Sequence, residues 1–372
     1  MKTIVLFAKV VAIFILALFV LRFVASAQQP AQPPDMQIDA VARTTVIENL
    51  IKELNAGYVF PEIAKNLEAD LRKRQVAKEF DSITSAQAFT KKLTDDLQAI
   101  SKDKHLRVRF SAQPIPVRVQ RGEPTEAERE QNRLSTRRIN YGFERVERLT
   151  GNIGYIDLRG FSDHDAGAET VAAAMKFLEN TEAIIFDLRQ NGGGSPFMVA
   201  LISSYLFSDK PVHLNSLYFR PANRTDDFWT KPELAKVKFP NKDVYILTAN
   251  RTFSAAEEFT YNLKNLKRAT IVGETTGGGA HPGGVHRLHE HFAVFIPSGR
   301  AINPISKPDW EGTGVDPDIK VPKEQALKVA HVMAITKLHD SEKDPETKAA
   351  IKRIIDQMQK ELDEMKQVAK AN

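Results

Sequence analysis

The chain has 372 residues, of which 42% are hydrophobic and 27% are charged, and its formal net charge is +5. This length suits one large or two unequal domains, and the composition excludes wholesale disorder. Basic residues alternate with acidic ones, as in 118–138, and no basic stripe carries interleaved aromatic side chains. We therefore expect no nucleic-acid partner.

The N-terminus has the pattern of a secretory signal. Two lysines among the first nine residues precede the apolar run Val10–Leu21, and Ala25-Ser26-Ala27 offers a small-x-small cleavage site. The alternative is an uncleaved membrane anchor, but Arg22 ends the apolar run short of a comfortable span. We predict a signal peptide at 1–27 and no stable membrane anchor. The absence of cysteine excludes disulfides and cysteine-linked lipid, which suits a periplasmic or extracellular protein that has crossed the inner membrane.

A flexible Pro-rich segment at 28–40 precedes a predicted helical domain at 41–111, in which apolar residues such as Val46, Leu50 and Leu54 recur at helical spacing. The domain ends on HLRVRF (105–110), which alternates as a strand does. Residues 112–138 are polar and contain three prolines, so we predict a linker over 112–150.

From residue 151 the chain alternates between strand and helix patterns, which predicts an α/β core over 151–322. Strands are expected at 152–158, 183–188, 243–248, 269–273 and 292–296, and helices at 166–180, 195–207 and 254–266. The charged stretch 323–372 predicts a helical tail that faces solvent or a partner.

Three turns in this core carry unusual chemistry, and the first is Asp187-Leu-Arg-Gln-Asn-Gly-Gly-Gly194. Three consecutive glycines after a buried strand free the backbone to point N–H groups at an anion. A flexible turn, or a phosphate site, would use the same residues.

The second turn, Asn250-Arg-Thr-Phe-Ser254-Ala-Ala-Glu257, places a serine between a buried strand and a helix. There the hydroxyl of Ser254 lies at the positive end of the helix dipole, and the N–H of Ala255 faces the position where an oxyanion would form. However, Ser254-x-x-Glu257 also fits a plain capping box.

The third turn, Gly273–His281, is again rich in glycine, and it raises the question of the base that a nucleophilic serine needs. Spacing alone does not choose among the five candidate histidines, which are His105, His281, His286, His289 and His291. Three of these could instead bind zinc, but the chain has neither cysteine nor an H-E-x-x-H helix, so we expect no metal and no cofactor.

Together these motifs resemble a known family. The order DLRQNGGG, NRTFSAAEEF, RATIVGETTGGGAH and EGTGVDPDI is similar to the tail-specific (C-terminal processing) serine peptidases, and most closely to the branch of the tricorn core protease and interphotoreceptor retinoid-binding protein. The resemblance spans roughly residues 40–322. It implies a crotonase-like α/β core behind a small helical domain.

The resemblance also assigns roles to residues. It makes Ser254 the nucleophile, and Gly279 stands where one branch has a lysine base. Asp103-Lys104-His105 matches the D-x-H pattern that supplies a histidine base in the other branch, and Glu311 matches a glutamate of the catalytic network. The cation of Lys104 is expected to lower the pKa of His105.

Hydrolysis of a peptide or protein substrate is therefore the predicted function. The N–H groups of Ala255 and Gly193 would hold the oxyanion, and Gly194, Gly278 and His281 would bind substrate. The alternative, from the retinoid-binding relatives, is a non-catalytic carrier of hydrophobic small molecules. A scaffold that recruits a partner through its C-terminal helix is a third possibility.

Overall fold

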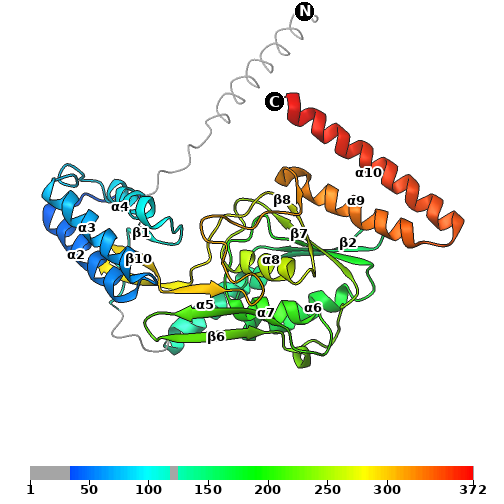
Figure 1. Ribbon diagram of the computed structural model, residues 1–372, viewed down its shortest axis with the longest axis horizontal. Helices are drawn as coiled ribbons and strands as arrows, with labels where there is room; N and C mark the ends of the chain where they lie inside the picture. The colour runs from blue at the N-terminus through cyan, green and yellow to red at the C-terminus, as the bar shows by residue number, and fades with distance from the viewer. Residues whose placement is uncertain (1–33, 118–124, 372) are drawn as a thin grey trace, which may run out of the picture.

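The computed structural model describes residues 34–117 and 125–371, so the predicted signal peptide lies outside the described residues. Figure 1 shows three N-terminal helices at one end of the molecule, a large α/β body, and a long C-terminal helix that projects from it. No helix within the described ranges is long and apolar enough to cross a membrane.

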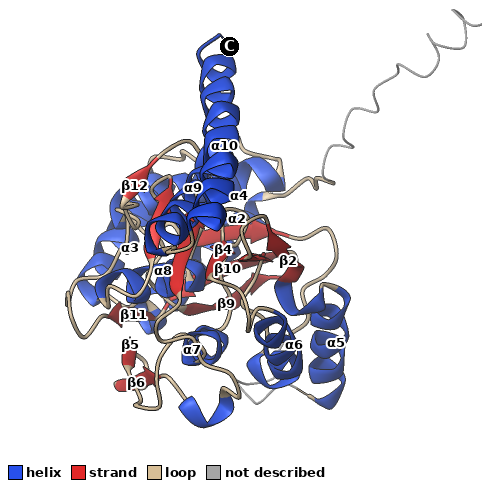
Figure 2. Cartoon of the chain, turned by 90° about the vertical axis from the view of Figure 1, so that its right-hand side faces the viewer, coloured by secondary structure: helices blue, strands red, loops and turns tan. Residues whose placement is uncertain are grey.

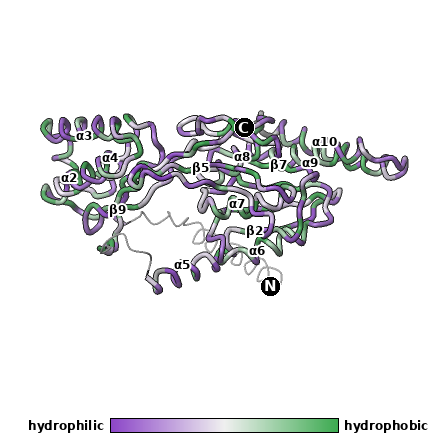
Figure 3. Tube along the Cα trace, turned by 60° about the horizontal axis from the view of Figure 1, so that its bottom comes forward, coloured by the Kyte–Doolittle hydropathy of each residue, from purple (hydrophilic) through white to green (hydrophobic). Residues whose placement is uncertain are grey.

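The N-terminal helices are α2 (Ala40–Gly57), α3 (Pro61–Val76) and α4 (Ala86–Ser101). The side chains of Asp39 and Ser85 cap α2 and α4 by accepting backbone N–H groups of the first turn. Hydrophilic and hydrophobic residues alternate along the tube of all three helices in Figure 3, and the apolar residues meet in one shared core.

These helices pack on a three-stranded antiparallel sheet in the order β1–β10–β9, with β1 at Arg107–Phe110, β10 at Phe292–Pro297 and β9 at Gly283–His289. The sequence predicted that 292–296 belongs to the α/β core, and this was wrong. The strand exists, but Phe292, Val294 and Ile296 point into the core of the N-terminal helices. Two segments about 180 residues apart thus form one sheet.

The α/β body is built on a six-stranded sheet in the order β12–β8–β7–β4–β3–β2. The strands are β2 (Phe143–Leu149), β3 (Ile153–Leu158), β4 (Ala183–Asp187), β7 (Asp243–Thr248), β8 (Thr270–Gly273) and β12 (Ile319–Lys320). Neighbouring strands are parallel except for the pair β2–β3.

Helices cover both faces of this sheet, which explains why its central strands are apolar throughout. One face packs on α6 (His164–Phe177), α7 (Pro196–Ser204) and α8 (Ala255–Asn265). The other face packs on α9 (Lys323–Ser341), and α10 (Pro345–Ala371) lies against α9 (Figure 2).

The solvent-facing or partner-facing role predicted for the C-terminal tail is therefore wrong for α9. Its residues Ala326, Ala330 and Ile335 are buried against the strands. Small and aliphatic residues between the charged ones are enough for that contact. The high content of charged residues therefore gave no indication that one face of α9 is buried.

Several elements lay outside the sequence-based prediction. The helix α5 (Glu126–Arg138) occupies part of the predicted linker, and β5 (His213–Phe219), β6 (Arg224–Trp229) and β11 (Gly299–Ile302) form a second three-stranded sheet. Short 3-10 helices lie at Asn140–Gly142 and Pro232–Leu234. The helix α5 is polar almost throughout, so it has no apolar periodicity that could reveal it.

Candidate active site

The three chemically unusual turns follow the carboxyl ends of β4, β7 and β8, which are adjacent in the large sheet. Open α/β sheets bind ligands at this edge. A cavity of about 740 Å³ lies there, and its lining includes Ser254, Ala255, Gly194 and His105. The structure thus brings four of the predicted site residues to one cavity.

Ser254 occupies a strained position at the start of α8. Its backbone has φ 56° and ψ −124°, whereas an ordinary helix-capping residue lies in the extended region. Left-handed backbone at a residue other than glycine costs on the order of 1–3 kcal/mol and persists only where the surroundings enforce it. A capping role alone therefore does not account for Ser254, although Glu257 does accept its N–H at 2.9 Å.

Glu257 joins the serine turn at 250–257 to the glycine-rich turn at 273–281. Its buried carboxylate accepts four hydrogen bonds, from the N–H groups of Ser254, Gly278 and Gly279 and from the hydroxyl of Thr276, at 2.5–2.9 Å. Burial raises the pKa of Glu257, and these donors oppose the rise. The N–H of Gly278, predicted to bind substrate, is thus committed to Glu257.

The predicted oxyanion donors differ in their availability. The N–H of Ala255 is in the first turn of α8, where no helical acceptor exists, and it has no hydrogen bond within the described residues. The N–H of Gly193 instead donates to Asn191 Oδ1 at 2.8 Å, so it could serve an oxyanion only if that bond opened. In the described ranges the N–H groups of Gly192 and Gly194 have no such partner, and both residues line the cavity.

Gly193 nevertheless has to be a glycine. A Cβ built on it would lie 2.7 Å from Ser254 Cβ and 2.9 Å from Ala255 N, and its φ is +104°. Any side chain there would fill the space in front of the Ala255 N–H. The glycine therefore keeps this donor open to a ligand.

His105 lies in an apolar environment beside the serine. Its ring is 4.6 Å from the ring of Phe253 and 5.6 Å from that of Phe295, measured between centroids, and its Nδ1 is buried without a hydrogen-bond partner. Burial lowers its pKa to about 4, with Asp103 opposing the shift and His281 and Arg107 adding to it. The imidazole is therefore neutral at physiological pH and available as a base.

The effect predicted for Lys104 is not what lowers this pKa. The ammonium group of Lys104 donates to the carbonyl of Gly277 at 2.5 Å, and the shift comes first from burial. His105 also explains the glycine at position 279. A Cβ on Gly279 would lie 2.6 Å from His105 Cε1, so the imidazole occupies the space that a lysine at this position would need.

His281 is buried in a cluster of carboxylates and does not line the cavity. Its Nδ1 is 2.7 Å from Asp103 Oδ2 and 3.5 Å from Glu311 Oε2, and its Nε2 is 3.5 Å from Asp309 Oδ2. Burial opposes the charged form, but bonds to Asp103 and Asp309 outweigh it and raise the pKa to about 10. His281 is thus a cation, which suits neither a base nor direct contact with substrate.

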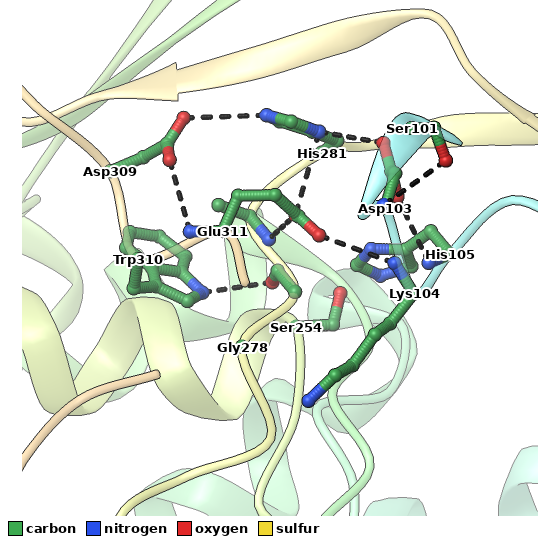
Figure 4. Close-up of polar contacts among 12 residues, drawn as sticks. Ser101, Asp103, Lys104, His105, Ser254, Gly278, His281, Asp309, Trp310 and Glu311 are labelled. Carbon is green, nitrogen blue, oxygen red and sulfur yellow. Dashed lines mark hydrogen bonds and ion pairs between the residues drawn. The ribbon is translucent and has the colours of Figure 1, made fainter. Parts of the chain in front are cut away.

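Glu311 contacts the backbone next to the base and makes no hydrogen bond to the described His105 ring. Its carboxylate accepts the N–H of Lys104 at 3.3 Å and that of Ala280 at 2.5 Å. Burial and the charge of Asp103 raise its pKa to about 7. In Figure 4 the hydroxyl of Ser254 points toward the side of the site where His105 and Glu311 lie.

The carboxylates around His281 are also the most plausible metal ligands beside the cavity. Ligand atoms of Asp103, His281 and Glu311 lie within 4.8 Å of one another. The cation of His281 pairs with the carboxylates of this cluster, so its geometry is explained without an ion. Of the histidines considered for zinc, His286 pairs with Glu53, and His291 Nδ1 donates to the backbone carbonyl of Ser111.

Comparison with known proteins agrees with this geometry. Residues 152–321 match the model of peptidase family S41, and residues 40–137 match the model for the N-terminal domain of peptidase S41 in eukaryotic IRBP. The chain belongs to peptidase family S41. The second match covers the segment that supplies His105, and the first covers the segment that supplies Ser254.

This S41 chain is similar to carboxyl-terminal-processing peptidase 1 of Arabidopsis thaliana chloroplasts, with 27% identity over 49% of the chain and 36% of the relative. It is 24% identical to the Staphylococcus aureus protein named "Probable CtpA-like serine protease", over 63% of the chain and 45% of the relative. The chain thus spans less than half the length of these curated relatives.

Solved structures show the same fold. A candidate peptidase from Parabacteroides merdae matches the S41 chain with a TM-score of 0.54 and 16% identity, over 78% of this chain and 96% of the other. Mature CPAF matches with a TM-score of 0.50 and 13% identity, over 77% and 94% of the two chains. Both support a mixed α/β fold with a helical N-terminal region.

The sequence did not reveal two features of this S41 site. Glu257 was considered only as half of a capping box, yet it joins two of the three turns. Phe253 precedes the serine and packs on both His105 and the position of Gly279. Its place directly before Ser254 in the motif was the available signal for this role.

Proposed function

We propose that this protein is a serine peptidase in which Ser254 is the nucleophile and His105 is the general base. The observation that carries the proposal is the shared cavity. It brings together a serine in a strained strand-to-helix turn, an open backbone N–H at Ala255 and a histidine that burial keeps neutral.

In the proposed reaction His105 takes the proton of the Ser254 hydroxyl as the oxygen attacks the substrate carbonyl. The N–H of Ala255 stabilises the oxyanion, together with a glycine N–H from the 192–194 turn. The charge of Asp103 favours the imidazolium that forms, which then protonates the leaving amine. Glu311 positions the base through the backbone of Lys104.

The roles proposed for Gly278 and His281 are positioning roles. The first orients the turn through Glu257, and the second neutralises Asp103 next to the base. Gly194 lines the cavity and remains a proposed contact for substrate backbone.

The non-catalytic carrier is not favoured, because it needs neither a base kept neutral by burial nor an open oxyanion site. Reaction with a fluorophosphonate probe tests the difference. We expect the wild-type protein to be labelled at Ser254 and Ser254→Ala to lose both labelling and peptidase activity, while its melting temperature changes little. A wild-type protein that resists the probe and cleaves no peptide would contradict the proposal.

Three finer features are part of the same proposal. They are a crotonase-like core, the predicted division into signal peptide, helical domain, linker, core and tail (apart from the strand at 292–296, which belongs with the helical domain), and a periplasmic or extracellular location. The chloroplastic and CtpA-like relatives support export or compartmentalisation. N-terminal sequencing from the native host tests the signal peptide, and an intact Met1 would contradict cleavage.

A further inference from the structure

A second carboxyl group, Glu258, lies in the cavity beside Ser254 and has no role in the reaction described above. Its side chain lines the cavity although the residue is only 5% exposed. Its Oε1 is buried and has no hydrogen-bond partner among the described residues. The neighbouring Glu257, in contrast, has four donors.

The position of Glu258 places it below the nucleophile. Residues four apart lie on one face of a helix, so Ser254, Glu258 and Asn262 follow one another along the same side of α8. One turn of helix separates Ser254 from Glu258, which is a rise of about 6 Å. A long side chain of the substrate can therefore extend to Glu258 while the scissile carbonyl of the same residue lies at Ser254.

One further polar side chain without a partner lies next to Glu258. It is Asn215 on β5, whose Nδ2 and Oδ1 are both buried without a hydrogen bond of good geometry among the described residues. Burying polar groups without partners is costly, so Glu258 and Asn215 require an explanation. A ligand group that supplies the missing partners is such an explanation.

We infer that this polar floor, with Glu258 at its centre, is the specificity pocket for a lysine or arginine side chain immediately N-terminal to the scissile bond. This inference rests on the proposed peptidase function and names its substrate class. An ammonium or guanidinium group offers only hydrogen-bond donors, and the Glu258 carboxylate at the cavity wall can accept them. Leu217, Ala301 and Trp310 in the cavity wall suit the aliphatic stem.

The ionisation of Glu258 favours a cationic ligand at the floor of the cavity. Burial raises the pKa of Glu258 to about 8, with Asn215 opposing the shift, so the empty pocket avoids an unpaired buried charge. A cation that enters favours the ionised carboxylate and pairs with it in a site shielded from water. Four cationic side chains also line the cavity, namely Lys104, Arg107, Arg109 and Arg251. The three arginines are exposed, so solvent screens their repulsion, and the ammonium group of Lys104 donates to the carbonyl of Gly277.

The test measures kcat/KM for peptides that differ only in the residue before the scissile bond, namely Arg, Lys, Leu, Ala or Glu. We expect the wild-type enzyme to prefer Arg and Lys at least about 10-fold over Leu, and Glu258→Gln to lower kcat/KM for the Arg and Lys peptides by about 100-fold and for the Leu peptide by less than about 10-fold. Glu324→Gln, which removes an exposed carboxylate on α9, is the matched control and should keep the wild-type preference.

A preference for Leu, Ala or Glu in the wild-type enzyme, or an equal loss for all peptides in Glu258→Gln, would overturn the inference. If Glu258→Gln does not fold, competition in the wild-type protein decides. n-Butylguanidinium should slow fluorophosphonate labelling of Ser254 and n-pentanol should not, and equal behaviour would overturn the inference. If the wild-type protein reacts with the probe but shows no preference for Arg and Lys peptides, only the specificity inference is contradicted. If it never reacts with the probe, the peptidase proposal is contradicted.

Discussion

The partly buried His105 and the buried His281 lie at the same glycine-rich turn, and their surroundings give them different charges. His105 packs between Phe253 and Phe295 with an unpaired Nδ1, and its pKa falls to about 4. His281 lies among Asp103, Asp309 and Glu311, and its pKa rises to about 10. The same side chain is therefore a neutral base in one place and a permanent cation in the other.

This contrast teaches that proximity to a nucleophile does not make a histidine its base. The sequence offered five candidates, and spacing could not separate them. The difference comes from aromatic and acidic neighbours that are distant along the chain, and four measurements can test it.

The two histidines should differ most in how much their substitution lowers kcat. His105→Ala should lower kcat by about 10³- to 10⁴-fold because the proton acceptor is lost, whereas His281→Gln should lower it by about 10- to 100-fold through misplaced neighbours. Steady-state kinetics on one peptide substrate measures both. If His281→Gln is the dead enzyme and His105→Ala keeps most of its rate, the assignment of the base is wrong.

A side chain at position 279 should act through His105. The Cβ of Gly279→Ala would meet the rings of Phe253 and His105 at 2.2 and 2.6 Å, so we expect displacement of the base, a loss of about 100-fold in kcat and a destabilisation of about 1–3 kcal/mol. Gly284→Ala is the control, because its Cβ meets nothing closer than 3.8 Å. If Gly279→Ala keeps the wild-type kcat, the position of the His105 ring next to residue 279 is not required for catalysis.

The pH profile should report the low pKa of the base. Since His105 is active when neutral, kcat/KM for the Leu peptide, which does not engage Glu258, should stay high from pH 8 down to about pH 5 and fall toward pH 4. A histidine with its ordinary pKa of about 6.5 would already lose most of its activity at pH 5.5. A fall centred near pH 6.5 would contradict the neutral, buried base.

The smallest effect concerns stability and comes from His281. Its proton is held more tightly in the folded than in the unfolded chain, so the stabilisation is complete below about pH 6.5 and is lost as the pH rises toward 10. Urea unfolding should show a decrease in the free energy of unfolding of at least about 1 kcal/mol between pH 6.5 and 9.5. His281→Gln should flatten this dependence, and an unchanged slope in the variant would argue against a charged His281.

The parts of the fold that could be predicted from the sequence are those in which local pattern and burial agree. The strand at 243–248 was predicted with its observed bounds, and the helix after Ser254 was predicted to within a residue, because buried parallel strands are short apolar runs and helix starts carry polar caps. The serine turn and the two glycine-rich turns were also recognised, since each follows such a strand.

The remaining features depend on partners that the sequence does not place. About half of the residues in the hairpin of β5 and β6 are polar. The strand β10 lies outside the large sheet and pairs with β1. The N–H of Gly193 was predicted to hold the oxyanion, but it donates to Asn191 Oδ1. This acceptor is only two residues away, yet the bond depends on the backbone conformation of the turn, which the sequence does not give. Glu258 could have been suspected from its spacing of four residues from Ser254.

The pairing of β1 with β10 has a consequence for how the protein becomes active. It joins Arg107–Phe110 to residues 292–295, and the base at 105 reaches the serine only through this closure. Closing so long a stretch of chain is entropically costly and slow compared with local folding. A growing or partly folded chain therefore carries the nucleophile long before it carries a working site, so we expect destructive chemistry to be withheld until nearly the whole polypeptide has been made and folded.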